Sequence, residues 1–204
     1  TPVGLFATDD AYFVVPGDSD FQTWEDWVEY ARGQDSVVVG GIGTVNVDFI
    51  LHELLAEAAG YEIEYVPFNE EGQLQTALFS GSLDAMVSNT GSILGQIEAG
   101  EVRPLLFTGK ERLDVLPDVP TGEEKGITDL PAMPRGMILP PEAPQEAQDW
   151  WIETMKEVVE TPEWQEYIES NYLTENILWG EDFQNYLGEV VDEFTEILTE
   201  AGAL

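Results

Sequence analysis

The residues best suited to bind a ligand lie in the segment GGIGTVNVD, Gly40–Asp48. Three glycines over four positions end an apolar run, and a helical pattern begins directly after them. Backbone N–H groups in such a turn are free to bind an anion, and the first N–H groups of a helix attract carboxylate or phosphate. Thr44 and Asn46 can add hydrogen bonds or cap the helix. The glycines alone fit a tight strand-to-helix turn equally well, so both interpretations stay open.

Two more loops stand between an apolar strand pattern and a helical one, at Asn69–Gly72 and Ser88–Ser92. In a parallel sheet, the loops that leave the carboxyl ends of the strands lie side by side, and ligands bind there. We therefore expect these loops to form one site with Gly40–Asn46. The expected ligand-binding residues in the three loops are Gly41, Ile42, Gly43, Thr44, Asn46, Asn69, Ser88, Asn89 and Thr90, and Asp48 follows the first loop.

Other kinds of site find little support in the sequence. A phosphate loop needs Lys followed by Ser or Thr after its last glycine, and neither this nor the dinucleotide spacing occurs after Gly43. His52 opens a HELL stretch like that of a zinc-protease helix, but Ala56 stands where the second histidine belongs. With one histidine, no cysteine and no Ser-His-acid set, we expect no enzyme, no cofactor and no metal.

A repeated unit of strand, loop and helix positions these loops. The apolar patterns predict strands at 36–40, 61–68, 83–89 and 102–108. Helices are predicted at 47–60, 73–81 and 93–100, with loops at 69–72 and 90–92 before the last two. Each helix stops at a glycine, namely Gly60, Gly81 and Gly100. This alternation builds a parallel sheet covered by helices.

Further helices are predicted on both sides of this unit. In Ser19–Gln34, Thr23 is the expected N-cap and Asp26 stands at the capping-box position. Residues 110–144 contain seven prolines, as expected of an irregular connection between lobes. Helical periodicity then covers 145 to about 171, with a break at 161–164, and 182–201.

The composition indicates a folded and very acidic protein. The 204 residues include 41 Asp and Glu against 7 Lys and Arg, a net charge of −34, and 43% hydrophobic residues support a packed core. The acids occur on every predicted helix, which favours adaptation to high salt over a surface for a basic partner. Nucleic acid is excluded as a partner because no basic patch exists to neutralise phosphates.

The sequence has no cysteine, no apolar run near the length of a membrane span and no signal peptide. It opens at TPVGLFATDDAYFVV, which reads like the middle of a domain. We therefore expect that an upstream part is missing.

Several segments in order resemble one family of receptors. They are VVVGGIGTVNVDFILHELLAEAAG, YVPFNEEGQLQTALFSGSLDAMVSN, GQIEAGEVRPLLFTGKERLDVLPDVPTGEEKGI and RGMILPPEAP. The chain is similar in these segments to the tripartite tricarboxylate transporter substrate-binding proteins, the TctC-like or Bug receptors, without their N-terminal third. The resemblance implies an α/β, type II periplasmic-binding-protein-like fold with two lobes, parallel-rich sheets flanked by helices and an incomplete first lobe.

The resemblance also implies how the chain is divided. Residues 14–103 would form the second lobe, and residues 1–13 and 104–204 would form the rest of the first lobe with the C-terminal helices. The lobes would close around the ligand by a hinge near Tyr12–Val15 and Arg103–Phe107.

Site residues carried over from the family match only in part. Gly40, Gly41, Gly43 and Thr44 match its glycine-rich loop, Asp48 matches an acid near the helix start, and Phe49 replaces a frequent histidine. Asn69 matches the second loop, but Glu70 and Glu71 replace small residues there. The two glutamates either repel an anionic solute or, as we expect, point outward as part of the acidic surface. Ser88 and Asn89 match the third loop. Arg135 with Gly136 matches an Arg-Gly pair, although Pro134 stands where an aromatic residue is usual.

Arg135 is one of only seven basic residues and lies among prolines. It either binds a carboxylate of the ligand in a bidentate way or forms an ion pair between the lobes. Both interpretations stay open on the sequence.

The resemblance implies a solute receptor without catalytic activity. We expect a monomer outside the cytoplasm that captures a small carboxylate, such as a di- or tricarboxylate, for the permease subunits of a membrane transporter. Two alternatives are a sensor or adaptor that acts through its acidic surface, and an α/β enzyme whose catalytic half lies elsewhere.

Overall fold

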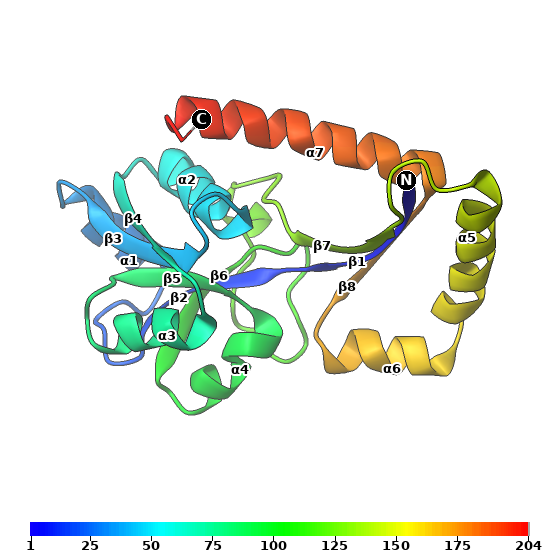
Figure 1. Cartoon of the computed structure of the whole chain (residues 1–204). Helices are drawn as coiled ribbons and strands as arrows, with labels where there is room; N and C mark the ends of the chain where they lie inside the picture. Colours follow the sequence, from blue (N-terminus) through cyan, green and yellow to red (C-terminus); the bar gives the residue numbers. More distant parts are fainter. Residues whose placement is uncertain (204) are drawn as a thin grey trace.

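A computed structural model describes residues 1–203, and two β-sheets organise this part of the chain (Figure 1). The larger sheet has five strands in the order β4-β3-β5-β2-β6. Their bounds are Ala11–Pro16 for β2, Val37–Ile42 for β3, Ile63–Phe68 for β4, Ala85–Asn89 for β5 and Val102–Phe107 for β6. Strand β3 lies between β4 and β5 and pairs in parallel with both, as the strand-loop-helix pattern predicts.

The larger sheet is mixed because β2 lies between β5 and β6 and runs antiparallel to both. Successive residues of β2 face opposite sides of the sheet. Phe13 packs in the core with Trp27 and Leu55, whereas Tyr12 packs in the core with Leu74 and Ile93. The sheet is therefore buried on both faces, which explains its nearly unbroken apolar strands.

Four helices cover these faces, α1 (Trp24–Arg32), α2 (Val47–Ala59), α3 (Glu71–Phe79) and α4 (Thr90–Glu98). The predicted capping box at the start of α1 is confirmed: Thr23 Oγ1 accepts the Asp26 N–H at 3.2 Å, and Asp26 Oδ2 accepts the Thr23 N–H at 2.9 Å. Gly60 closes α2 at φ 70°, as predicted. The predicted loop at 90–92 is wrong, because α4 begins directly at Thr90.

The smaller sheet is antiparallel, with the order β7-β1-β8. Its strands are β1 (Pro2–Asp9), β7 (Met133–Ile138) and β8 (Thr174–Trp179). The expectation that 110–144 is irregular throughout is wrong, because β7 and a short 3-10 helix, η1 (Glu123–Lys125), lie within it. Three helices follow, α5 (Gln145–Val159), α6 (Pro162–Ser170) and α7 (Gly180–Glu200), and the break between α5 and α6 is confirmed.

The chain passes between the sheets at residues 9–11 and 107–109, and these two crossings are joined. Ala11 donates its N–H to Thr108 Oγ1 at 2.8 Å, and Thr108 donates its N–H to the Ala11 carbonyl at 2.9 Å. The larger sheet thus includes residues 11–13 and 104–107, which lie just outside the predicted lobe 14–103. The predicted hinge segments are paired strands of this sheet, and the crossings lie at their ends.

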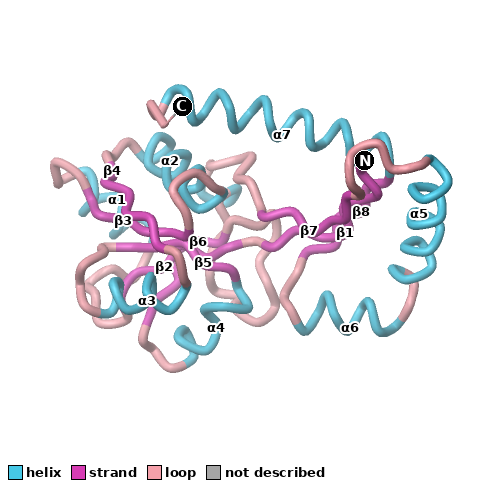
Figure 2. The backbone as a smooth tube through the Cα atoms, in the orientation of Figure 1, coloured by secondary structure: helices cyan, strands magenta, loops and turns pink. Residues whose placement is uncertain are grey.

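Helix α7 extends from the smaller sheet to the larger one (Figures 1 and 2). At its start, Phe183 is buried next to Gly136 of β7. At its end, Leu198 is buried in one cluster with Phe49 and Ile50 of α2. Within residues 1–203, none of the helices is both apolar enough and long enough to span a bilayer.

Candidate functional site

The carboxyl ends of β3, β4 and β5 lie at one edge of the larger sheet, because the three strands run parallel. Asn89, at the end of β5, pairs with Ala11 at the crossing, so this edge faces the smaller sheet (Figure 1). We call residues 42–46, 69–71 and 88–92 the loop edge. The structure brings the three predicted loops together there, and their contact with a ligand stays a prediction.

The backbone of the first loop requires glycine at two positions, whether or not a ligand binds there. A Cβ on Gly41 would come within 2.5 Å of the Asp48 Cβ and 2.7 Å of the Tyr65 hydroxyl. Gly43 has φ 77°, a conformation that side chains other than glycine rarely adopt. The tight-turn interpretation is therefore sufficient to explain the glycines, and any role in binding has to rest on free hydrogen-bonding groups.

Most polar groups of the first loop form hydrogen bonds within the loop or to the adjacent end of β4. Asp48 Oδ2 accepts the Ile42 N–H at 2.7 Å, and the Gly43 N–H goes to the Phe68 carbonyl at 2.8 Å. Asn46 Oδ1 caps α2 by accepting the Asp48 N–H at 3.0 Å. Ile42, Gly43, Asn46 and Asp48 thus hold the loop together, and Thr44 remains exposed at its tip.

Asp48 is an unusual carboxylate because it lies half-buried at the start of α2. Its pKa is raised to about 6: burial is the largest cause, the nearby charge of Glu71 adds to it, and the hydrogen bond from the Ile42 N–H opposes both effects. Tyr65 completes this arrangement by donating its hydroxyl to the Gly43 carbonyl at 3.0 Å, and burial raises the pKa of that hydroxyl.

The helices of the other two loops begin differently. At the N-cap positions of α3 and α4, the side chains of Glu70 and Asn89 form no capping hydrogen bond. The Thr90 hydroxyl in the first turn of α4 is fully buried, and it finds no hydrogen-bond partner among residues 1–203. The unpaired groups suited to an anion therefore lie at the starts of α3 and α4 more than in the glycine-rich loop.

The sequence did not indicate that Glu71 faces inward. Its Oε1 accepts the Ser88 hydroxyl at 2.5 Å, and the side chain is half-buried, so the expectation that it points outward is wrong. Glu70 and Asn69 are exposed. The position of Glu71 at the first residue of a helix on the candidate edge was the available signal, because that position faces the same side as the helix N–H groups.

Arg135 forms an ion pair with Asp9, and both residues lie in the smaller sheet. The pair is therefore not between the lobes in the sense expected, but within one sheet. Asp9 is buried, and its carbonyl accepts the Asn89 amide at 3.1 Å, so the pair also reaches the loop edge. The sequence signal for Asp9 was an acid inside the otherwise apolar run Gly4–Val15.

The next residue, Asp10, is also buried at the crossing. Burial raises its pKa, and the charge of Asp9 adds to this, whereas the hydrogen bond from Thr174 and the charge of Lys110 oppose it. The Thr174 hydroxyl donates to Asp10 Oδ2 at 2.7 Å. Two neighbouring carboxylates at the crossing are thus each held by a residue of the smaller sheet.

His52, the single histidine, is a core residue. Its Nε2 lies 3.1 Å from the Gly40 carbonyl, and complete burial lowers its pKa to about 4. No group of three or more His, Asp or Glu side chains within residues 1–203 is placed to hold a metal ion.

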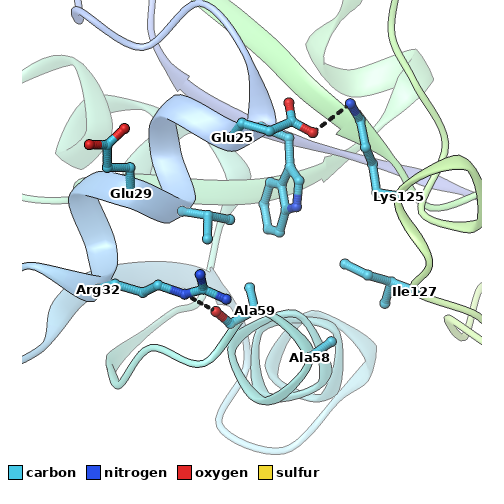
Figure 3. A pocket seen from close by; sticks show the side chains of 9 residues that line it. Glu25, Glu29, Arg32, Ala58, Ala59, Lys125 and Ile127 are labelled. Atoms are coloured by element: carbon cyan, nitrogen blue, oxygen red, sulfur yellow. Dashed lines mark hydrogen bonds and ion pairs between the residues drawn. The ribbon is translucent and has the colours of Figure 1, made fainter.

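Two cavities of the molecule lie away from the loop edge. One of about 560 Å³ is formed by α1, the C-terminal end of α2 and residues 125–127 (Figure 3). Its two cations are engaged, since Lys125 pairs with Glu25 at 2.7 Å and Arg32 donates to the Ala59 carbonyl at 2.6 Å. About 18 Å of helix separates it from the loop edge.

The second cavity, of about 430 Å³, lies on the smaller sheet. Arg135 and Gly136 line it together with the apolar residues Phe6, Ala7, Trp164, Tyr167 and Leu173. None of its lining residues belongs to the loop edge, so the structure does not bring Arg135 into one cavity with the predicted loops.

Comparison with known proteins gives one consistent result. Residues 1–202 match the family described as the tripartite tricarboxylate transporter family receptor. The chain belongs to this receptor family. A curated relative from Agrobacterium vitis, a UPF0065 protein of the TAR-I ttuE-ttuC' intergenic region, is 31% identical over 162 residues, which are 78% of this chain and 47% of the relative.

Solved structures agree with this receptor family. An R. palustris protein solved with adipate is 20% identical with a TM-score of 0.82, over 99% of this chain and 68% of that one. MatC from Rhodopseudomonas palustris, with bound malate, is 18% identical with a TM-score of 0.72, over 98% and 67%. The α/β receptor fold and the absence of catalysis predicted from the sequence are thus those of the family. The chain spans about half the length of the curated relatives that it matches.

Proposed function

We propose that this receptor captures a small carboxylated solute at the loop edge, outside the cytoplasm, and delivers it to the permease subunits of a tripartite tricarboxylate-type transporter. The observation that carries the proposal is the meeting of two uncapped helix starts, α3 and α4, at the carboxyl edge of parallel strands. Such an edge binds anions. Family members solved with adipate and malate support a carboxylate as the ligand.

The first turn of α4 is the proposed carboxylate position. Its N–H groups carry the partial positive charge of the helix start and lie beside the buried, unpartnered Thr90 hydroxyl. Thr44 and Asn69, which are exposed, and Ser88 and Asn89 would surround the solute. Ile42, Gly43, Asn46 and Asp48 would act indirectly by shaping the first loop.

Movement of the two lobes is also part of the proposed function. The larger sheet with its helices would move against the smaller sheet, with the paired crossings at Ala11 and Thr108 as the hinge. The lobe boundaries expected at 14 and 103 would then shift to these crossings, because β2 and β6 each belong wholly to the larger sheet. The net charge of −34 supports a protein adapted to high salt, so binding should be measured in molar salt.

Thr90 provides the sharpest test of the proposed position. Replacing Thr90 by Val keeps the shape and removes a buried hydroxyl without a partner, so the free energy of unfolding should rise by about 1 kcal/mol. The same change should weaken solute binding by about tenfold, because a bound carboxylate loses one hydrogen bond. Calorimetric titration with malate, adipate, citrate and amino acids, together with thermal unfolding, measures both effects.

Thr90→Ser is the matched control, since it keeps the hydroxyl and should retain binding. Unchanged affinity in Thr90→Val would show that the carboxylate does not lie at the start of α4. Failure of every carboxylate in the panel to bind the unaltered protein would contradict the proposed function itself.

A further inference from the structure

Glu71 lies at the centre of the loop edge. It follows β4, and its carboxylate reaches Ser88 at the end of β5. Because β3 lies between β4 and β5 in the sheet, this hydrogen bond passes over the end of β3, where the first loop begins. Within residues 1–203, the two hydrogen bonds that the Glu71 side chain accepts, from Ser88 and from Gln75, both use Oε1. Oε2 therefore remains available to a group outside the described residues 1–203.

The charge at this edge is negative. None of the seven basic residues of the sequence lies in the loop edge, whereas Glu70 and Glu71 do, and Asp48 stands directly behind the first loop. On the facing side, Arg135 is paired with Asp9. Lys110 lies close enough to Asp10 to lower the pKa of that carboxyl. The loop edge itself therefore offers no basic side chain to a second carboxylate of the solute.

A second observation at the same edge is a buried polar group that could accept a partner from a ligand. The fully buried Thr90 hydroxyl has no partner among residues 1–203, and it lies two residues after Ser88. A buried hydroxyl without a hydrogen bond costs free energy that a bound polar group recovers. Ser88, two residues before the start of α4, thus binds Glu71, an acceptor of positive charge, next to a helix start suited to negative charge.

We propose that the solute is an amino carboxylate, with its carboxylate at the start of α4 and its ammonium group on Glu71. The inference rests on the proposed function and narrows the solute class of the same site. An ammonium group neutralises Glu71, whereas a second carboxylate at that position is repelled by Glu71 and Asp48.

A metal ion that accompanies a dicarboxylate is the other source of positive charge. The structure favours the ammonium group, because no three acidic or histidine side chains within residues 1–203 converge as metal ligands do. Titrations with and without a chelator distinguish the two sources.

The test compares acids that differ only by an amino group: succinate with aspartate, glutarate with glutamate, and propionate with alanine. In calorimetric titrations at molar salt, we expect at least one amino acid to bind at least about tenfold more tightly than its amine-free partner. Glu71→Gln keeps an acceptor for Ser88 and should weaken binding of that amino acid by about 10- to 100-fold. The amine-free acid should bind Glu71→Gln as well as, or better than, the unaltered protein.

Glu70→Gln is the matched control, because it removes the same charge from the neighbouring exposed position and should change neither affinity. If Glu71→Gln does not fold, the comparison of paired acids on the unaltered protein still shows whether the solute is an amino carboxylate. Equal or tighter binding of the amine-free acids, or succinate binding that a chelator abolishes, would overturn the inference and leave the proposed function standing. No binding by any of the six acids would overturn both.

Discussion

The two sheets hold their polar groups in different ways. In the first loop of the larger sheet, Asn46 and Asp48 bond to near neighbours in the chain, such as Asp48 with Ile42, six residues apart. In the smaller sheet, Arg135 is paired with Asp9, 126 residues away, and Thr174 with Asp10, 164 residues away. One region is thus a set of locally specified turns, and the other is assembled from distant parts of the chain.

The two regions also differ in which of them carries the basic residue. The loop edge has helix starts, hydroxyls and carboxylates but no basic residue, whereas the one guanidinium nearby belongs to the smaller sheet and is neutralised there. In the proposed function, an anionic group would therefore be recognised through backbone N–H groups more than through a cation. The preference among carboxylates would then depend on side chains such as Glu71.

The largest expected effect comes from breaking the local packing of the loop edge. Gly41→Ala should lower the free energy of unfolding by about 3 kcal/mol, because the new methyl group meets Asp48 and Tyr65. Denaturant unfolding measures it. Gly72→Ala is the matched control, since nothing lies within 4 Å of its Cβ position, and it should be neutral or stabilising. Similar losses in both variants would show that the close approach of Asp48 is not what requires Gly41.

The ion pair of the smaller sheet should matter somewhat less. Arg135→Ala leaves the buried Asp9 carboxylate without its partner, and we expect a loss of about 2 kcal/mol in unfolding free energy. Adding Asp9→Asn should recover part of this loss, because the amide carries no charge. A melting curve unchanged by Arg135→Ala, combined with weaker binding, would instead make Arg135 a ligand residue and remove the contrast between the two sheets.

The smallest effect concerns pH at the loop edge. The pKa of Asp48 is raised in the folded protein from 3.8 to about 6, so ionisation of this group opposes folding. Its stabilising contribution is present below pH 4 and is lost as pH rises through about 6. Asp48→Asn keeps an acceptor for the Ile42 N–H and should therefore be more stable than the unaltered protein at neutral pH, by about 1 kcal/mol.

Thermal unfolding of both proteins from pH 4 to pH 8 gives the measurement. The difference between Asp48→Asn and the unaltered protein should grow over the interval from about 4 to about 6. A constant difference across the range would mean that Asp48 is not destabilised by ionisation. Such a result would also weaken the view that Glu71 and Asp48 repel each other.

The same contrast explains what the sequence could predict. Strand-loop-helix periodicity and glycine stops are local signals, so β3, β4, β5 and their helices follow from the pattern. Strands β7 and β8 lie beside β1 only through pairing across more than a hundred residues, and the prolines around β7 conceal it. β7 lies at an edge of its sheet, where proline is tolerated, so Pro134 does not prevent pairing.

The candidate site shows the same limit at the level of single residues. That the three loops meet could be predicted, because parallel strands place their carboxyl ends together. Which N–H groups remain free could not, because this depends on Asn46 and Asp48 turning back onto their own loop. The inward position of Glu71 depends likewise on Ser88, which comes from another strand.

Helix α7 would affect any movement of the two sheets relative to each other. Its first turn is anchored at the smaller sheet by Phe183, and its last turns pack through Leu198 on Phe49 and Ile50, next to the capped start of α2. The two sheets are thus joined by one continuous helix in addition to the two paired crossings. The proposed movement of one sheet against the other would have to shift or bend α7, so part of the resistance to it would arise next to the first loop.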